Sequence, residues 1–368
     1  MDELVAPPVR GLRPYVPGKS IAELERTYGF SECARLDSNE NPLGAGVRAR
    51  RAVLEASEGI GAYPDAGALE LKARLSRHHG VPVECITLGN GSNEILSLLT
   101  GTFLAAGVEA VYSQFCFAIF PLLVQASGAQ GRFARAYSSR ESMPFGHRPG
   151  GLLEQVTSRT RLVYIANPNN PTGTWVGEAP LLDFLEALPR TTLAVVDEAY
   201  FEYSREWGCP DASLWLPRLP NLVVVRTFSK AYGLAGLRTG YCLSHPEVAE
   251  RLNRVRQPFN VSSIAQAAAL AALDDVEHLE RTVRLNRDGQ RQLREGLERL
   301  ALTVVPTAGN FVLVDTRRPA EEIHEKLLHH GVIVRPAQDY GLTQHLRVTI
   351  GTAEQNQRFL IALSRVLS

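Results

Sequence analysis

The stretch Leu222–Gly240 reads LVVVRTFSKAYGLAGLRTG. Its four consecutive aliphatic residues predict a strand buried on both faces, and the glycines after it predict a tight loop. The loop presents Lys230 close to the hydroxyls of Thr227 and Ser229 and, eight residues later, Arg238. A lysine, unlike an arginine, can lose its proton when desolvated and attack a carbonyl. Because only four of the 39 basic residues are lysines, we predict a functional role for Lys230 rather than a chance surface position.

Further apolar runs predict the rest of the fold. They are bounded by Gly, Pro, Asn or Asp and alternate with helical segments, which is typical of a mostly parallel sheet covered by helices, an α/β fold. These runs are Ile86–Leu88, Ala110–Tyr112, Leu162–Ile165 and Leu193–Val196. A long helical region from Ser262 to Leu302 and two later β runs, Asn310–Val314 and Leu346–Ile350, predict a smaller α+β domain. We therefore divide the chain into an N-terminal arm (1–35), a large domain (36–260) and a small domain (261–368).

Composition argues against several classes of function. The 39 basic residues are balanced by 39 acidic ones, which disfavours a nucleic-acid or anionic-membrane surface. The five cysteines are scattered, odd in number and without a CxxC pair, so reduced thiols in the cytoplasm are expected rather than disulfides. The nine histidines show no spacing typical of metal ligands, and we predict no metal. The first eight residues lack the apolar core of a signal peptide.

Polar residues follow three of the predicted strands, where ligands bind in parallel sheets. Residues 89–94 read GNGSNE and open a helix, which would suit an anion, although an N-cap serine explains them as well. Residues 167–173 read NPNNPTG, a sequence also common in turns. Asp197 follows Leu193–Val196, and it is either the partner of a buried cation or a helix N-cap.

Taken together, these segments resemble the fold-type-I pyridoxal-phosphate aminotransferases, and within them the histidinol-phosphate aminotransferase family. The resemblance runs from the arm to the small domain, and the combination of its motifs in this order is specific to the family. It implies a large domain with a mostly parallel seven-stranded sheet, a smaller α+β domain, and pyridoxal 5'-phosphate as the cofactor. The segments that carry it are RPYVPG (13–18), SNENPLG (38–44), YPD (63–65), NPNNPTG (167–173), DEAY (197–200), residues 227–238 and LRVTIG (346–351).

The resemblance implies a role in cofactor binding or catalysis for each matching residue. Lys230 would bind the cofactor's aldehyde and act as the base, and Asp197 would keep the pyridine nitrogen protonated. Tyr63 would reach the cofactor phosphate from the second subunit of a homodimer with shared active sites. The remaining implied roles are hydrogen bonds to the phenolic oxygen from Asn170 and Tyr200, phosphate binding by Ser92, Asn93, Thr227, Ser229 and Arg238, and ring stacking by Phe117, which could instead be a core residue.

The resemblance also implies a substrate end of the site. Arg335 and Arg347 would bind the anionic group of the substrate, because the arginine fork binds phosphate or carboxylate through two hydrogen bonds. The resemblance places Tyr15, Asn41 and Phe259 on the same side of the site. Phe259 and residues 112–120, YSQFCFAIF, depart from the tyrosine-containing patterns common in the family, which makes the expected pocket more apolar.

The function implied is amino transfer from L-histidinol phosphate to 2-oxoglutarate, giving imidazole acetol phosphate and L-glutamate, in histidine biosynthesis. An aromatic amino-acid aminotransferase, or a relative in a specialised pathway, is the alternative that the apolar departures favour. A decarboxylase of the threonine-phosphate type shares the scaffold and remains open. A cofactor-binding regulatory domain is disfavoured because no basic DNA-binding module is present and every catalytic position is filled.

Overall fold

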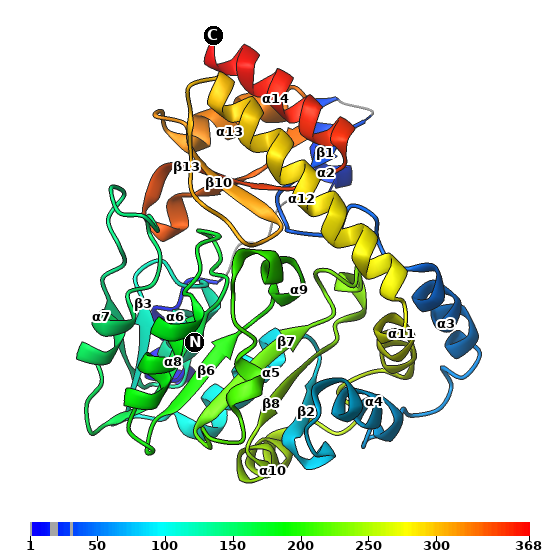
Figure 1. The fold of residues 1–368 in the computed structure, drawn as a ribbon, viewed down its shortest axis with the longest axis vertical. Coiled ribbons are helices and arrows are strands. Elements are labelled where there is room, and N and C mark those ends of the chain that lie inside the picture. The colour runs from blue at the N-terminus through cyan, green and yellow to red at the C-terminus, as the bar shows by residue number, and fades with distance from the viewer. Residues whose placement is uncertain (1, 15–20, 30–31) are drawn as a thin grey trace.

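The computed structural model describes residues 2–14, 21–29 and 32–368. Its central feature is a seven-stranded sheet in the order β2-β8-β7-β6-β5-β3-β4 (Figure 1). All neighbouring strands are parallel except that β8 runs antiparallel to both β2 and β7, so the predicted mostly parallel sheet is confirmed. The strands are β2 (Ile86–Gly89), β3 (Glu109–Ser113), β4 (Gln130–Ala134), β5 (Thr160–Ala166), β6 (Leu193–Asp197), β7 (Leu222–Thr227) and β8 (Gly240–Ser244).

The two faces of this sheet are covered by different sets of helices. Val195 and Val225 pack in a core shared with α5 (Ser92–Phe103), α6 (Ile119–Ala126) and α10 (Pro246–Val255). Their neighbours Val196 and Val224 pack in the other core, with α3 (Val47–Ser57), α4 (Leu69–His79), α7 (Pro149–Glu154), α8 (Glu178–Ala187) and α11 (Ser263–Leu273). Successive residues of a strand point to opposite faces, so strands covered on both sides must be apolar throughout.

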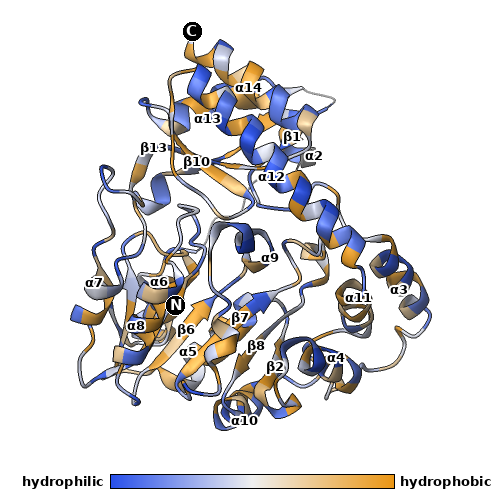
Figure 2. Ribbon diagram, in the orientation of Figure 1, coloured by the Kyte–Doolittle hydropathy of each residue, from blue (hydrophilic) through white to orange (hydrophobic). Residues whose placement is uncertain are grey.

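A second, antiparallel sheet lies above the first, in the order β12-β13-β10-β9 (Figure 1). Its own core includes the buried side chains of Val312, Leu346 and Phe359, which confirms the predicted smaller α+β domain. Figure 2 shows apolar residues on β10 and mostly hydrophilic ones along α12. The elements are β9 (Thr303–Val304), β10 (Phe311–Asp315), β12 (Arg335–Ala337), β13 (Leu342–Thr349), α12 (Val276–Arg299), α13 (Ala320–Leu328) and α14 (Ala353–Leu367).

The N-terminal segment joins this second layer. β1 (Ala34–Arg35) pairs in parallel with β11 (Val332–Ile333), and a short helix, α2 (Ile21–Tyr28), precedes it in the predicted arm. α1 (Pro7–Arg10) packs instead on α6. The short elements are α9 (Phe201–Ser204) and the 3-10 turns Asp2–Leu4, Val83–Cys85, Arg205–Trp207, Ala212–Trp215, Ala235–Leu237 and Gln338–Tyr340.

The helical region predicted from Ser262 to Leu302 is two helices, α11 and α12. They separate at Asp274–Asp275, where the Asp275 side chain accepts a hydrogen bond from the backbone N–H of His278 at the start of α12. α11 packs on α3 and α4 within the large-sheet core, whereas α12 continues to the smaller sheet. The domain division at residue 260 stays a prediction, and this packing favours a boundary after α11.

Among the helices in the described ranges, none combines the length and the apolar character that crossing a membrane requires. The structure joins none of the five cysteines in a disulfide. It also places no group of three or more His, Cys, Asp or Glu side chains in a metal-binding arrangement within residues 2–14, 21–29 and 32–368.

Candidate active site

A cavity of about 180 Å³ opens at the carboxyl ends of β5, β6 and β7. Parallel sheets bind ligands at this edge, and the cavity gathers most of the residues predicted for the site. Those predicted and present are Ser92, Asn93, Phe117, Asn170, Asp197, Tyr200, Thr227, Ser229, Lys230, Arg238 and Arg347, and Asn39, Ala166, Pro168 and Ala199 complete the wall.

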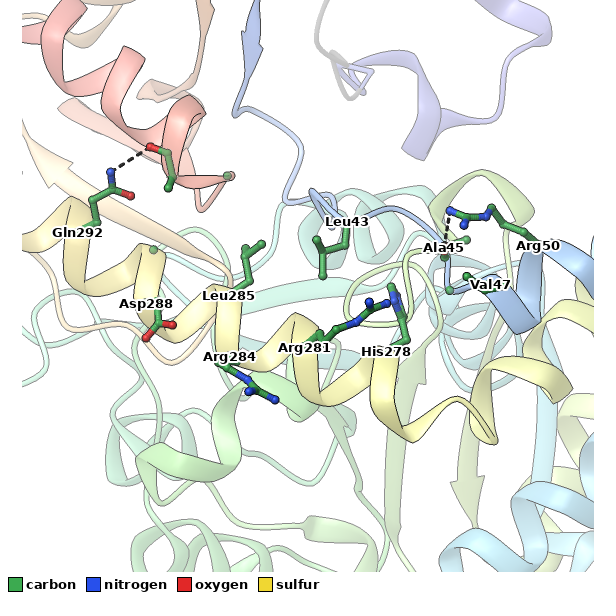
Figure 3. Close-up of a pocket in the computed structure, with 14 residues that line it drawn as sticks. Leu43, Ala45, Val47, Arg50, His278, Arg281, Arg284, Leu285, Asp288 and Gln292 are labelled. Carbon is green, nitrogen blue, oxygen red and sulfur yellow. Dashed lines mark hydrogen bonds between the residues drawn. The ribbon is translucent and has the colours of Figure 1, made fainter.

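Three larger cavities contain none of the predicted site residues, and one of them, of about 530 Å³, lies beside α14. A second, of about 590 Å³, lies between residues 43–50 and α12, and Figure 3 shows Arg50, Arg281 and His278 around it. The third, of about 790 Å³, lies between α9 and α12 and is lined in part by Arg226 and Glu202. Size alone therefore does not locate the site, whereas the set of convergent polar groups does.

Lys230 lies in the loop that connects β7 with the antiparallel β8. The backbone N–H of Phe228 donates to Thr239 O (3.0 Å), which ties the two ends of the loop together. The Lys230 ammonium donates to Ser38 O at 3.1 Å. Burial, followed by the nearby positive charge of Arg347, lowers the pKa of Lys230 to about 8. A larger share of Lys230 is therefore neutral near pH 7 than of an ordinary lysine.

Asp197 is the last residue of β6 and is 4% exposed. Its Oδ1 accepts a hydrogen bond from the backbone N–H of Ala199 at 3.1 Å. Within the described residues this carboxylate forms no ion pair, and the positive charge that acts on it from a longer distance is that of Lys230. Burial raises the pKa of Asp197 to about 7. A buried carboxylate in this state is suited to a positively charged ligand atom.

Next to Asp197, the hydroxyl of Tyr200 accepts a hydrogen bond from Asn39 Nδ2 at 2.9 Å. Asn39 has a positive φ of 54°, and its backbone N–H donates to Thr349 Oγ1 at 2.9 Å. Asn41, from the same motif, was predicted as a site residue, whereas Asn39 was not. Asn41 Nδ2 donates to Ala231 O (2.9 Å) and Thr282 Oγ1 (3.0 Å), away from the cavity wall.

Residues 89–93 and Arg238 form an anion cradle at the N-terminus of α5. A Cβ atom on Gly91, whose φ is 83°, would lie 2.5 Å from Arg238 Nη2. A Cβ atom on Gly240 would lie 2.5 Å from the backbone nitrogen of Ser92. Glycine at both positions therefore lets the guanidinium and the helix N-terminus converge. Arg238 Nη1 also donates to Ala235 O at 3.0 Å and approaches Ser229 Oγ at 3.4 Å.

Arg347 of β13 enters the cavity from the smaller sheet. Its Nη1 donates to Asn170 Oδ1 at 2.7 Å and its Nη2 to the backbone oxygen of Asp37. Its Nε is buried and has no hydrogen-bond partner among the described residues. This donor can therefore serve an anionic ligand. Asn170 belongs to the predicted NPNNPTG turn, in which the Asn167–Pro168 and Asn170–Pro171 peptide bonds are cis.

Arg335 lies opposite Arg347 in the β12–β13 register but does not line the cavity. Its Nη2 forms an ion pair with Asp339 Oδ2 at 3.3 Å. Phe117 does line the cavity, and its ring packs edge-on against Phe120 at 5.8 Å. Phe117 therefore contributes to the core as well as to the cavity wall.

Besides Arg335 and Asn41, two more predicted site residues, Tyr63 and Phe259, lie outside the cavity. The rings of Tyr63 and Phe259 stack on each other at 4.7 Å on the surface, where Tyr63 is 83% exposed. Tyr15 lies outside the described residues. Tyr63 and Phe259 therefore cannot contact a ligand in the cavity of their own chain without a large movement.

Comparison with known proteins agrees with this geometry and confirms the resemblance inferred from the sequence. Residues 31–363 match the family "Aminotransferase class I and II". The chain is 51% identical to histidinol-phosphate aminotransferase 2 of Methylococcus capsulatus, over 99% of this chain and 98% of that protein. It is 48% identical to histidinol-phosphate aminotransferase 1 of Nitrosococcus oceani, over 99% and 97% of the two chains.

Among solved structures, histidinol-phosphate aminotransferase from Sinorhizobium meliloti in complex with pyridoxal-5'-phosphate superposes with a TM-score of 0.90. The two chains are 31% identical, and the match covers 99% of this chain and 97% of that one. The chain therefore belongs to the class I and II aminotransferases, within the family of the histidinol-phosphate aminotransferases.

Proposed function

We propose that this chain is a pyridoxal-phosphate-dependent histidinol-phosphate aminotransferase of histidine biosynthesis. It transfers the amino group of L-histidinol phosphate to 2-oxoglutarate and releases imidazole acetol phosphate and L-glutamate. The observation that carries the proposal is the cavity itself. It combines a lysine of lowered pKa, a buried carboxylate without a cation, an anion cradle and a second, separate guanidinium.

The residues of the cavity fit pyridoxal phosphate. The cradle made possible by Gly91 and Gly240 suits its phosphate, which Ser92, Asn93, Thr227, Ser229 and Arg238 would hold. Asp197 suits the ring nitrogen, because a protonated nitrogen would supply the positive counter-charge that the Asp197 carboxylate does not have in an ion pair within the described residues. Asn170 and Tyr200 would donate to the phenolic oxygen, and Phe117 would stack on the ring. When bound, the cofactor supplies an electron sink for the negative charge that develops at the substrate Cα.

The chain's own residues perform the proton transfers and the binding. Lys230 would bind the cofactor through its aldehyde carbon, and its neutral Nζ would serve as the base that takes the proton from the donor Cα. The pKa of about 8 helps because a base must be partly neutral at the working pH. Asp197, once opposite a positive charge, stays ionised and stabilises the transition state.

The substrate phosphate would bind at the Arg347 end of the cavity. The N–H of Arg347 Nε has no partner there among the described residues, and Arg335 lies opposite Arg347 on the neighbouring strand. Two guanidinium groups match a phosphate dianion better than a single carboxylate, because each needs its own anionic oxygen. Tyr15 would add a hydroxyl from the arm. The hydrogen bond from Asn41 to Ala231 O supports an indirect role, in which Asn41 holds the loop of Lys230.

We infer a cytoplasmic homodimer in which the partner subunit completes each site. Tyr63 and Phe259 are predicted site residues, yet they face outward on their own chain. The same region exposes Leu54, Ile60 and Leu69, each to 67% or more. Exposed apolar residues concentrated near a predicted shared-site tyrosine support an interface at this surface. Through it, Tyr63 would reach the cofactor phosphate of the partner.

The alternative function is an aromatic amino-acid aminotransferase, which Phe117 in the cavity wall favours. The test is a comparison of kcat/KM for L-histidinol phosphate, phenylalanine, tyrosine and histidine, each with 2-oxoglutarate. We expect histidinol phosphate to lead. A tenfold preference for phenylalanine or tyrosine, equivalent to about 1.4 kcal/mol of transition-state stabilisation, would establish the alternative instead.

A further inference from the structure

Directly behind the cavity, a second set of residues occupies the same two strand ends. Side chains alternate along a strand, so Asp197 and Thr227 point into the cavity while their neighbours Glu198 and Arg226 point to the opposite face. The alternation is visible one step earlier, where Val195 and Val225 pack on the α5 side and Val196 and Val224 pack on the α8 side. The cavity and this second set are thus separated by the backbone of β6 and β7 alone.

Glu198, Asp211 and Arg226 form an ionic cluster, which we call the Arg226 cluster, in which Glu198 and Arg226 are buried and Asp211 is partly exposed. Arg226 donates to Glu198 Oε2 from both Nε (3.0 Å) and Nη2 (2.8 Å), and the two side chains are 3% and 0% exposed. Arg226 Nη2 also donates to Asp211 Oδ1 at 2.6 Å. The second oxygen of Glu198 accepts the backbone N–H of Ala212 at 2.9 Å. The charges are therefore paired, and both Glu198 oxygens accept hydrogen bonds.

Two members of the cluster, Glu198 and Arg226, are sequence neighbours of the cavity residues Asp197 and Thr227. The backbone N–H of Glu198 donates to Val225 O at 2.8 Å, which joins the end of β6 to β7. The Arg226 guanidinium lies 3.5 Å from the ring centre of Phe201, the residue after Tyr200. The cluster therefore fixes a neighbour of three cavity residues. Glu198 follows Asp197, Phe201 follows Tyr200, and Arg226 precedes Thr227.

The cluster also sets the charge behind Asp197. The negative charge of Glu198 adds to burial in raising the pKa of Asp197, and Arg226 is the counter-charge of Glu198. Without Arg226, the buried Glu198 and the partly exposed Asp211 would lose their cation, and Asp197 would face an uncompensated negative charge. The other titratable groups that face the cluster are Glu202, Tyr232, Tyr241, His78 and His79.

We propose that Glu198, Asp211 and Arg226 are positioning residues, which hold Asp197 and Thr227 in register with the ring nitrogen and phosphate of pyridoxal phosphate. The proposal rests on the cofactor of the proposed function but not on the identity of the amino donor. None of the three residues lines the cavity, so their effect must pass through the strand ends and through charge.

The test compares Arg226→Met, Glu198→Leu and the double variant with wild type. The measurements are the dissociation constant of pyridoxal phosphate, the pH midpoint of the visible absorption of the holoenzyme, and the thermal midpoint of the apoprotein. We expect each single variant to weaken cofactor binding about tenfold or more and to shift the pH midpoint. The double variant removes the charges of both Arg226 and Glu198. Its loss of cofactor-binding free energy should therefore be smaller than the sum of the losses in the two single variants.

Two further variants keep the test decisive. Arg226→Lys retains the charge but loses the two-pronged contact, so it should fold and still weaken binding measurably. Glu109→Gln is the matched control, because Glu109 is also buried (1% exposed) and pairs with Arg159. It is the first residue of β3, so it lies at the amino-terminal ends of the strands, whereas the cavity lies at their carboxyl ends. It should lower the thermal midpoint and leave cofactor binding unchanged.

The outcomes are distinct. All folded cluster variants could lose thermal stability as Glu109→Gln does, while the cofactor dissociation constant stays within about twofold of wild type and the pH midpoint within about 0.3 pH unit. In that case the cluster is structural only and the proposal is overturned. If wild-type protein itself fails to bind pyridoxal phosphate, the proposed function is overturned, whatever the variants do.

Discussion

Asp197 and Glu198 are consecutive buried carboxylates at the end of one strand, and their environments differ completely. Glu198 accepts hydrogen bonds on both oxygens and is paired with Arg226, whereas Asp197 accepts one backbone N–H and has no cation at ion-pair distance in the described structure. A buried charge without a partner is costly for the chain alone. The difference separates a carboxylate that holds the fold together from one that is kept for a ligand.

The same contrast extends to the neighbouring groups. In the cavity, Arg347 Nε has no partner in the described residues, and Lys230 donates to the backbone oxygen of Ser38 and lies near the ring of Tyr200. In the Arg226 cluster, Arg226 uses Nε and Nη2 and stacks on Phe201. Among the described residues, the unpartnered Arg347 Nε and the Asp197 carboxylate without an ion pair therefore lie on the cavity side of β6 and β7, whereas the ion-paired Glu198 and Arg226 lie on the other side. The predictions below test whether this division is also a division of function.

The largest effect is expected for Lys230→Ala. This change removes both the group that binds the cofactor covalently and the base, so turnover should fall by at least about 10⁴-fold. Lys72→Ala is a matched control, because Lys72 is also partly buried with a lowered pKa but lies away from the cavity. Borohydride reduction followed by peptide mapping should label Lys230. Labelling at Lys72 or Lys326 would mean that the cavity is not the active site.

Asp197→Asn should lower kcat by about 10³-fold, because it withdraws the charge that stabilises the transition state. The phosphate cradle is untouched, so the variant should keep much of its affinity for pyridoxal phosphate. Steady-state kinetics and a cofactor titration check the two statements separately. Turnover near that of wild type would show that Asp197 serves as a helix cap and nothing more.

The pH dependence of apoprotein stability sharpens the same comparison. Asp197 has a raised pKa of about 7 against an ordinary value of 3.8, so the folded state binds its proton more tightly than the unfolded state does. The free energy of unfolding of wild type should therefore fall, relative to that of Asp197→Asn, as the pH rises from 4 to 7, by up to about 4 kcal/mol. Urea unfolding of both apoproteins across this range measures it. Parallel curves for the two proteins would contradict the assignment.

A smaller loss is expected for Gly91→Ala. The added Cβ would meet the Arg238 guanidinium, and the positive φ of Gly91 disfavours alanine, so cofactor binding should weaken by about ten- to a hundredfold. Gly101→Ala on the same helix is the control, because a Cβ there meets nothing within 4 Å and alanine favours helix. Equal cofactor affinity in the two variants would refute the cradle.

The smallest signal is the recovery of activity in mixed dimers. Lys230→Ala subunits mixed with Tyr63→Ala subunits should form hybrids in which one site has both residues intact. About a quarter of wild-type activity should return if subunits exchange freely. The measurement requires that Tyr63→Ala alone be strongly disabled. Hybrids demonstrated by mass spectrometry yet inactive would place Tyr63 within its own site.

Much of the large sheet could be predicted from the sequence, because its central strands are apolar on both faces. β4 escaped prediction because it is an edge strand whose residues, such as Gln130, Gly131 and Phe133, are exposed. β8 escaped because it begins at Gly240, within what looks like a continuous glycine-rich loop. The break between α11 and α12 depends on the side-chain cap of Asp275, which periodicity does not reveal.

The candidate site was predictable where a residue follows a strand in a recognisable motif, as Asp197, Lys230 and Arg238 do. The choice between Asn39 and Asn41 was not, because both occur in one motif and differ only in what the distant Thr349 and Thr282 offer them. The Arg226 cluster was also missed. Its members carry charge inside otherwise apolar or loop segments, and their pairing depends on a contact between residues 28 positions apart.

The attachment of the N-terminal segment to the smaller sheet determines the order in which the site can be completed during synthesis. Every strand of the large sheet lies between Ile86 and Ser244, so this sheet and the anion cradle can fold while later residues are still being added. Asn39, by contrast, bonds to Thr349, 310 residues later, and Ala34 pairs with Val332. The end of the cavity that holds Arg347 therefore cannot form until Thr349 has been synthesised, whereas the strands that carry the proposed phosphate cradle are complete about a hundred residues earlier.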